Sequence, residues 1–178
     1  MPSIVSALDE PYRECLEEAA GEVKAVTGRK ELVAPARPHV TLHVAERYTP
    51  GIEGALGRFA ASEAPLTFTT GEVGVFRGPQ VVVALQVLRN DALLRFQADL
   101  RAAIAPFAER PKPVYGAETW APHITIVAGR IDPAHIEGII AVLGRRDFAW
   151  TVPLTNVCLV PDASAHDWLR FDIGGANG

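Results

Sequence analysis

The chain has 178 residues, 48 % of them hydrophobic and 21 % charged, with a formal net charge of −4 at pH 7. A chain of this length suits one domain or two closely packed lobes, and it can bury roughly 70 % of its unfolded surface without a disulfide or a metal. The acidic balance argues against a protein that coats nucleic acid, because non-specific binding depends on many Lys and Arg contacts to phosphates, but it leaves room for a site that holds one phosphate.

Strands and helices alternate along the chain. Apolar residues at helical spacing, such as Leu16, Ala19 and Val23, indicate helices, and the clearest helix begins after Asn90, a plausible N-cap. Alternating or β-branched runs indicate strands. In chain order we expect a strand at 3–8, a helix at 11–26, a polar loop at 28–38, a strand at 39–46, a helix at 51–62, strands at 66–76 and 80–88 around a turn at 77–79, a helix at 91–108, a strand at 122–128, a helix at 133–144, and strands at 150–160 and 167–173.

The chain also repeats itself. The segment Pro-His-Val-Thr-Leu at 38–42 recurs as Pro-His-Ile-Thr-Ile at 122–126, which is 84 residues further along. Ile-Glu-Gly at 52–54 recurs at 136–138 with the same offset. One register shared over strand and helix indicates an internal duplication. We therefore predict a single domain over 1–178 with related halves at about 36–76 and 120–160.

The repeated segment carries a histidine and a threonine that point the same way. Residues two apart in a strand share a face, so His39 lies beside Thr41 and His123 beside Thr125, with roots about 6.6 Å apart. If a pseudo-twofold axis relates the halves, two imidazoles and two hydroxyls converge on one phosphate. One neutral imidazole can then deprotonate an attacking water while the other, protonated, donates to the leaving oxygen.

This pair of His-x-Thr-hydrophobic motifs resembles the 2H phosphoesterase superfamily, and most closely the bacterial 2'-5' RNA ligase and cyclic phosphodiesterase-type proteins. The resemblance covers nearly the whole chain, including the closing patterns at 159–162 and 168–174. It implies an α+β, bilobal, duplicated fold: two antiparallel-sheet lobes with helices outside and a central cleft. It also implies hydrolysis of 2',3'-cyclic phosphates to 2'-phosphates, with 2'-5' ligation or end trimming in some members, and no cofactor. His123 would activate water and His39 would protonate the leaving oxygen.

Other residues near the motifs are weaker candidates for substrate binding. Tyr115 and Trp120 flank the second motif and could stack on a base or simply pack in the core. Arg130, like Arg37, could neutralise phosphate charge. Many members of the family place an arginine sooner after the second motif, whereas here three residues, 127–129, precede Arg130.

The remaining histidines are interpreted as structural or solvated. His43 falls on the same face as His39 and Thr41 by alternation, but histidines four apart on a strand are about 13 Å apart and cannot hold one ion. His135 and His166 fall at a helix start and in a polar loop. No ligand cluster favours a metal hydrolase, so the alternative to an enzyme is a non-catalytic module that binds RNA ends or nucleotides.

The sequence predicts a cytoplasmic monomer with no membrane partner, whose substrate is an RNA 3' end or a cyclic nucleotide. The first residues lack the features of a secretory signal, and no apolar segment is long enough to cross a bilayer. Cys15 and Cys158 have no metal-type spacing and are interpreted as buried, reduced thiols.

Overall fold

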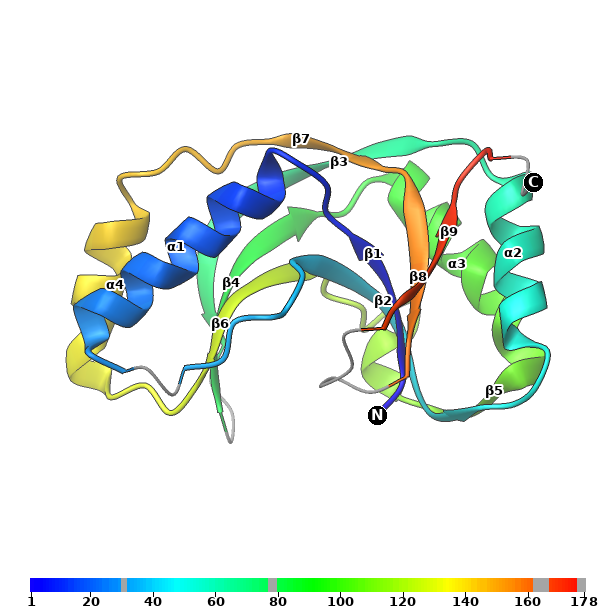
Figure 1. Ribbon diagram of the computed structural model, residues 1–178, viewed down its shortest axis with the longest axis horizontal. Coiled ribbons are helices and arrows are strands. Elements are labelled where there is room, and N and C mark those ends of the chain that lie inside the picture. Colours follow the sequence, from blue (N-terminus) through cyan, green and yellow to red (C-terminus); the bar gives the residue numbers. More distant parts are fainter. Residues whose placement is uncertain (30–31, 77–79, 162–166, 176–178) are drawn as a thin grey trace.

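The computed structural model describes residues 1–29, 32–76, 80–161 and 167–175 (Figure 1). Within them the chain forms an antiparallel sheet of nine strands with helices on its outer side, the α+β class that the sequence predicts. The elements are β1 (Ser3–Ala7), α1 (Tyr12–Thr27), β2 (His39–Tyr48), α2 (Ile52–Ser62), β3 (Leu66–Phe76), β4 (Val81–Leu88), α3 (Asp91–Ile104), η1 (Ala105–Phe107), β5 (Ala108–Pro111), η2 (Pro113–Tyr115), β6 (His123–Gly129), η3 (Pro133–His135), α4 (Ile136–Leu143), β7 (Thr151–Leu154), β8 (Asn156–Val160) and β9 (Leu169–Asp172).

The order of strands in the sheet is symmetric about its centre. It runs β7-β3-β4-β6-β2-β1-β8-β9, and β5 pairs with β2 outside this path. The series β3-β4-β6 on one side therefore mirrors β8-β1-β2 on the other. The two motif strands, β6 and β2, meet in the middle, where the pseudo-twofold axis expected from the repeat passes between them.

The sheet arches, and a pair of helices lies at each end of the arch (Figure 1). Helix α1 contacts α4 and β6, whereas α2 contacts α3. Neither lobe is formed by one half of the chain. Helix α1 directly follows β1, which lies in the lobe of β2 and β8, but it packs on the other lobe, against α4 and β6. The same holds for α3, which follows β4 and packs on α2. The chain thus crosses repeatedly between lobes that share one sheet.

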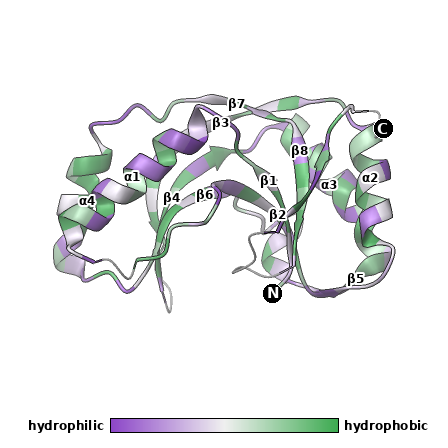
Figure 2. Ribbon diagram, viewed as in Figure 1, coloured by the Kyte–Doolittle hydropathy of each residue, from purple (hydrophilic) through white to green (hydrophobic). Residues whose placement is uncertain are grey.

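The main hydrophobic core lies between the sheet and its helices. It includes Leu42, Leu85, Leu100 and Ile124, each 0 % exposed. The helices alternate between hydrophobic and hydrophilic residues along their length, as expected for helices with one buried side (Figure 2). A second, small cluster forms on the other face of the sheet from residues of β1 and β8, with Trp168 packed against it. Both faces of the sheet therefore bury apolar surface.

The structure corrects several predicted boundaries. Asn90 caps α3 as predicted, accepting a hydrogen bond from Leu93 N at 2.8 Å, but the helix ends at Ile104 rather than 108, and a 3-10 turn containing Pro106 leads into β5. The strand expected at 150–160 is two strands separated at Thr155: β7 pairs with β3, and β8 pairs with β1. The turn expected at 77–79 and His166 lie outside the described residues. No described helix is long and apolar enough to cross a membrane.

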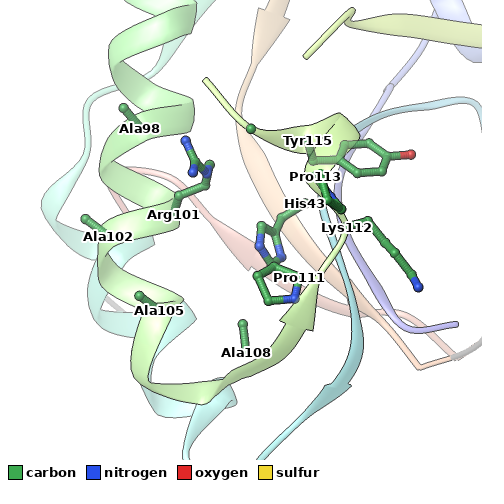
Figure 3. Close-up of a pocket in the computed structure, with 11 residues that line it drawn as sticks. His43, Ala98, Arg101, Ala102, Ala105, Ala108, Pro111, Lys112, Pro113 and Tyr115 are labelled. Atoms are coloured by element: carbon green, nitrogen blue, oxygen red, sulfur yellow. The ribbon is translucent and has the colours of Figure 1, made fainter. Parts of the chain in front are cut away.

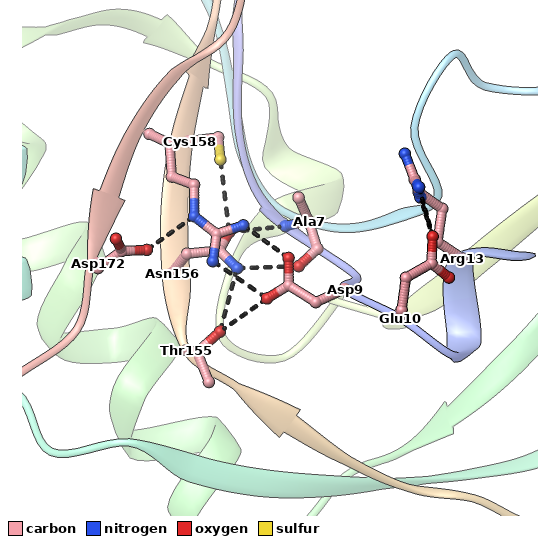
Figure 4. A network of polar contacts seen from close by, with 9 residues as sticks. Ala7, Asp9, Glu10, Arg13, Thr155, Asn156, Cys158 and Asp172 are labelled. Carbon is pink, nitrogen blue, oxygen red and sulfur yellow. Dashed lines mark hydrogen bonds and ion pairs between the residues drawn. The ribbon is translucent and has the colours of Figure 1, made fainter.

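A buried asparagine completes the junction between β1 and β8 (Figure 4). Asn156 is 0 % exposed, accepts a hydrogen bond from Ala7 N at 2.9 Å and donates one to Ala7 O at 2.9 Å. Beside it, Arg170 of β9 donates to both carboxylate oxygens of Asp9, at 2.8 and 3.0 Å, and to Asp172 at 2.7 Å. The backbone pairing of β1 with β8 ends at Val5, and beyond it side-chain hydrogen bonds hold the two strands together.

We expect Asn156→Ala to lower the free energy of unfolding by about 2–5 kcal/mol, because it leaves two buried backbone groups of Ala7 without partners. Thr155→Val is the control, since its hydroxyl makes only long contacts, 3.3 Å to Asp9 and 3.4 Å to Asn156 Nδ2, and it should cost less than about 1 kcal/mol. Denaturant unfolding of both variants measures the difference. Equal losses would show that the Asn156 hydrogen bonds to Ala7 contribute little.

Candidate active site

The two motifs lie on adjacent strands in the centre of the sheet. Val40 of β2 pairs with Ile124 of β6 in antiparallel register, which places His39 opposite Thr125 and Thr41 opposite His123. The four polar side chains then share one face, while Val40 and Ile124 point into the core and are 0 % exposed. In this register the two histidines are diagonal neighbours, with roots roughly 7–8 Å apart.

A β-bulge follows each motif at the equivalent position. Along β1 and β2 the register shifts between Val5↔Thr41 and Ile4↔His43, so that Leu42 is the extra residue. Along β4 and β6 it shifts between Ala84↔Thr125 and Val83↔Val127, so that Ile126 is the extra residue. Bulges bend a strand and re-aim the side chains that follow. Here they bend both motif strands directly after the threonines.

The bulge overturns the predicted direction of His43. Its partner is Ile4, which belongs to the core, so the His43 side chain turns to the helix side of the sheet, away from His39 and Thr41. It is 5 % exposed and its Nδ1 lies 2.6 Å from the Tyr48 hydroxyl. Burial, reinforced by the positive charge of Arg101, lowers the pKa of His43 to about 4. His43 is therefore a neutral, buried histidine outside the motif cluster.

On the side that faces β6, the backbone after the first motif is held by side chains rather than by strand pairing. The β2–β6 pairing comprises the single pair Val40↔Ile124, so the next carbonyls of β2 have no partner in β6. Trp120 donates from Nε1 to Thr41 O at 3.0 Å, and Gln97 of α3 donates to Leu42 O at 3.2 Å. These two donors fix the position of Thr41 where the lobes diverge.

Both motif histidines are oriented by the same local device. His39 Nδ1 lies 2.8 Å from Arg37 O, and His123 Nδ1 lies 2.9 Å from Ala121 O. A carbonyl only accepts hydrogen bonds, so Nδ1 carries the proton in both rings and Nε2 is left for a ligand. The proline between each pair restricts the preceding residue to extended conformations, which helps to aim its carbonyl at the ring.

The two rings are close enough to influence each other. Burial lowers the pKa of His39, the hydrogen bond to Arg37 O opposes this, and the charge of His123 lowers it further. The neutral form of His39 therefore predominates near neutral pH in the empty site. An anion bound between the rings would favour the charged form.

Two aromatic rings flank the histidines, and the sequence did not indicate either as a site residue. Trp168 meets His39 edge-on, with ring centroids 5.3 Å apart, and Phe76 lies 5.3 Å from His123. Arg37 lies over the Trp168 ring, 5.6 Å from its centroid. Phe76 is 42 % exposed. Trp168 falls in the closing pattern of the family, but its approach to His39 depends on the order of strands in the sheet.

The other residues that the sequence predicts to bind substrate lie at different distances from the motif. Tyr115 reaches the motif, because its hydroxyl interacts with the Thr41 side chain, which lowers the pKa of Tyr115 against the larger opposing effect of burial. Trp120 is 2 % exposed, so its ring is packed in the core and has no free face on which a base could stack. Arg130 is exposed beyond the end of β6, five residues past Thr125 and roughly 16 Å along the strand. The structure therefore does not bring Arg130 to the motif.

Among the described residues, no group of three or more His, Cys, Asp or Glu side chains could hold a metal ion. The groups gathered at the motif are two imidazoles, two threonine hydroxyls and a tyrosine hydroxyl. Together they can accept one proton, donate another and hold the oxygens of a tetrahedral anion.

Comparison with known proteins places the chain in a family. The family model described as the 2'-5' RNA ligase superfamily matches residues 13–164. No curated protein matches by sequence. The crystal structure of TT0787 of Thermus thermophilus is similar over 99 % of both chains, with a TM-score of 0.62 and 22 % identity. Two further structures share the fold. Escherichia coli LigT in its apo form has a TM-score of 0.55 and 20 % identity over 98 % of this chain and 99 % of that chain. Kluyveromyces marxianus Usb1 has a TM-score of 0.56 and 8 % identity over 97 % of both chains.

We expect His39 and His123 to be Nδ1–H tautomers when neutral, because a backbone carbonyl accepts from Nδ1 in each. Nitrogen-15 NMR of the imidazole rings at high pH distinguishes the two tautomers. His43 is the internal control: its Nδ1 faces a hydroxyl, which can donate to it. In the same titration His39 should lose its proton below the usual histidine pKa. Nε2–H tautomers at both motif histidines would contradict the geometry.

Proposed function

The chain belongs to the 2'-5' RNA ligase superfamily of 2H phosphoesterases, and on that premise we propose that it hydrolyses 2',3'-cyclic phosphates of RNA ends or nucleotides to 2'-phosphates. The observation that carries the proposal is the paired geometry of the motif. Two imidazoles, each with Nδ1 held by a backbone carbonyl, lie diagonally across one strand pair with a threonine beside each. Two proton-transfer groups suit displacement at phosphorus, whereas binding alone requires neither.

The reaction uses each ring once. A neutral imidazole takes a proton from water as its oxygen attacks phosphorus, and the P–O3' bond breaks. The charged imidazole gives its proton to O3', leaving a 2'-phosphate. The Thr41 and Thr125 hydroxyls donate to the non-bridging oxygens and hold the phosphorus in line. The same sequence, with the 5'-hydroxyl of a second strand in place of water, would join two strands through a 2'-5' link, and its reversal would cut such a link, so 2'-5' ligation or end trimming is compatible with the same site.

Nucleotide ligands in similar structures support this class of substrate. LigT has been crystallised with 3'-AMP and with ATP, and Usb1 with uridine monophosphate. In this chain Trp168 and Phe76 offer aromatic rings next to His39 and His123. Stacking on a base contributes about 1–3 kcal/mol. We propose these two rings, rather than Trp120, as the surfaces against which a base packs.

The two histidines have separate roles in the proposal. His123 acts as the base and His39 as the acid, as the family resemblance implies. The acid must be charged when substrate is bound, whereas burial keeps His39 neutral in the empty site. The phosphate supplies the negative charge that raises the pKa of His39 on binding. We therefore expect His39 to take up its proton only after an anion has bound in the site, and activity to depend on that binding.

A substrate panel tests the function. It contains 2',3'-cyclic mononucleotides, RNA ending in a cyclic phosphate, and 2'-5'-linked dinucleotides, all assayed in EDTA. We expect turnover of cyclic phosphates with 2'-phosphate products, and no turnover by the double variant His39→Ala/His123→Ala prepared in parallel. Binding of these ligands without any turnover would favour the non-catalytic module. Turnover that EDTA abolishes and a divalent ion restores would overturn the metal-independent mechanism.

We expect His39→Ala and His123→Ala each to lower kcat by about 10²–10⁴-fold, the usual contribution of one acid or base. The double variant should lose far less than the product of the single losses, because the two rings act as a unit. An aryl phosphodiester whose leaving group needs no proton should partly rescue His39→Ala and not His123→Ala. Equal rescue of both variants, or of neither, would refute this division of roles.

We expect Thr41→Val and Thr125→Val to bind substrate more weakly and to turn over more slowly while folding normally. Valine keeps the β-branched shape and removes the hydroxyl, so each change should cost about tenfold or more in kcat/KM. Thr41→Ser and Thr125→Ser keep a hydroxyl and are the matched controls. Kinetics unchanged in both valine variants would show that neither hydroxyl touches the phosphate.

A further inference from the structure

A cavity of about 440 Å³ lies between α3 and the segment that runs from β5 into η2, on the helix side of the sheet (Figure 3). The pairing of β2 with β5 separates it from the motif. So does Gln97, which donates to Leu42 O at 3.2 Å and to Tyr115 O at 2.9 Å and thereby bridges the two segments. A ligand in this cavity would therefore be distinct from a substrate held at the motif.

The α3 wall of the cavity carries a single charged side chain. Ala98, Ala102 and Ala105 leave the space beside the helix open, and Arg101 stands between them (Figure 3). Among the described residues Arg101 has no hydrogen-bond acceptor and no carboxylate partner, and none of the residues that line the cavity is acidic. The N–H donors of the Arg101 guanidinium are therefore left unused by the described part of the chain.

A buried histidine forms part of another wall. His43 is 5 % exposed, yet it lines the cavity. Its Nδ1 lies 2.6 Å from the hydroxyl of Tyr48, which does not line the cavity, so the ring presents its other edge, with Nε2, to the open space. Burial raises the pKa of Tyr48, so the hydroxyl keeps its proton and donates it to Nδ1. The proton of the neutral His43 ring is then on Nε2, which has no acceptor among the described residues.

These donors act on one space and all favour an anion. Burial, and after it the positive charge of Arg101, lowers the pKa of His43, so the guanidinium lies near enough to the ring for its charge to be felt there. Lys112 adds a second cation; it approaches Glu46 at 3.5 Å, but Glu46 also pairs with Arg110 at 2.9 Å. Charged and buried donors are costly to leave unpaired, and an anion bound between Arg101 and His43 would satisfy both.

We propose that this cavity is a second anion site, which binds a small phosphate-bearing ligand through Arg101, Lys112 and the Nε2–H of His43. A tetrahedral phosphate accepts hydrogen bonds from several directions at once, and a guanidinium holds two of its oxygens as a bidentate pair. The volume is that of a small-molecule site, and the alanines and prolines of the walls would contact an apolar body attached to the phosphate. The site does not depend on the reaction at the motif.

Calorimetric titration with inorganic phosphate and with glycerol 1-phosphate tests the proposal. The double variant His39→Ala/His123→Ala removes both motif imidazoles, and we expect it still to bind one ligand per chain. Adding Arg101→Gln to it should weaken that binding about tenfold or more. Arg95→Gln is the matched control, because it removes the same charge from an exposed position of α3 that does not line the cavity.

The two ligands distinguish the sources of the phosphate. Tighter binding of glycerol 1-phosphate assigns the site to a phosphate monoester, and tighter binding of inorganic phosphate assigns it to the free ion. No binding of either ligand to the double variant, or equal weakening by Arg101→Gln and Arg95→Gln, would overturn the proposal.

NMR of the imidazole rings in the wild-type protein locates the ligand. Inorganic phosphate should shift the resonances of His43, because its Nε2–H gains an acceptor, and it should raise the pKa of His43, because a bound anion favours the charged ring. His39 and His123 report binding at the motif in the same spectra. Shifts confined to the two motif histidines would show that phosphate binds only there, and the cavity site would be wrong.

A second pair of variants separates charge from shape and leaves every donor in place. Ala102→Glu places a carboxylate in the cavity, whereas Ala102→Gln adds the same bulk without charge. We expect Ala102→Glu to suppress the response of His43 to phosphate far more strongly than Ala102→Gln. Acetate is the ligand control, because it carries one charge and two oxygens in a plane. Equal effects of the two Ala102 variants, or acetate binding as tight as that of phosphate, would contradict a phosphate site.

Discussion

The molecule depends on one strand pair. Val40 and Ile124 form the only pairing between β2 and β6 in the described residues, and through it the two lobes share a continuous sheet. Because side chains alternate along a strand, this register also decides which residues face the core and which face the opposite side, where the motif histidines lie. A slip of one residue in either strand would turn its histidine into the core and its aliphatic residue outward. The hydrophobic requirement of the core therefore fixes the geometry of the polar site above it.

The surroundings of the two motifs are related but unequal. On the outer neighbours of the motif strands, Ala7 stands opposite His39, whereas Gln86 stands opposite His123. The small cluster of β1 and β8 brings Trp168 against His39, which contributes to the burial that keeps this ring neutral. Phe76 beside His123 is more open to solvent. Two rings held by equivalent backbone carbonyls thus have different surroundings.

Much of this arrangement could be predicted from the sequence, because it depends on local patterns. The offset of 84 residues indicated the duplication, and alternation placed His39 beside Thr41. Alternation failed at His43, because a bulge adds a residue without any mark in the sequence. The contacts of Trp168 and Phe76 with the histidines, and the distance of Arg130 from them, follow from strand order and strand length, which a pattern of residue types does not contain.

The exchange of α1 and α3 between the lobes has a consequence for the ancestry of the chain. A half-length ancestor with one such helix could not cover its own sheet, so it would have been complete only as a symmetric pair of identical subunits that swapped helices. Its catalytic centre would have held the same histidine twice, on a true twofold axis. Neither ring could then have differed from the other. A single chain has no such constraint, and here Ala7 stands opposite His39 whereas Gln86 stands opposite His123.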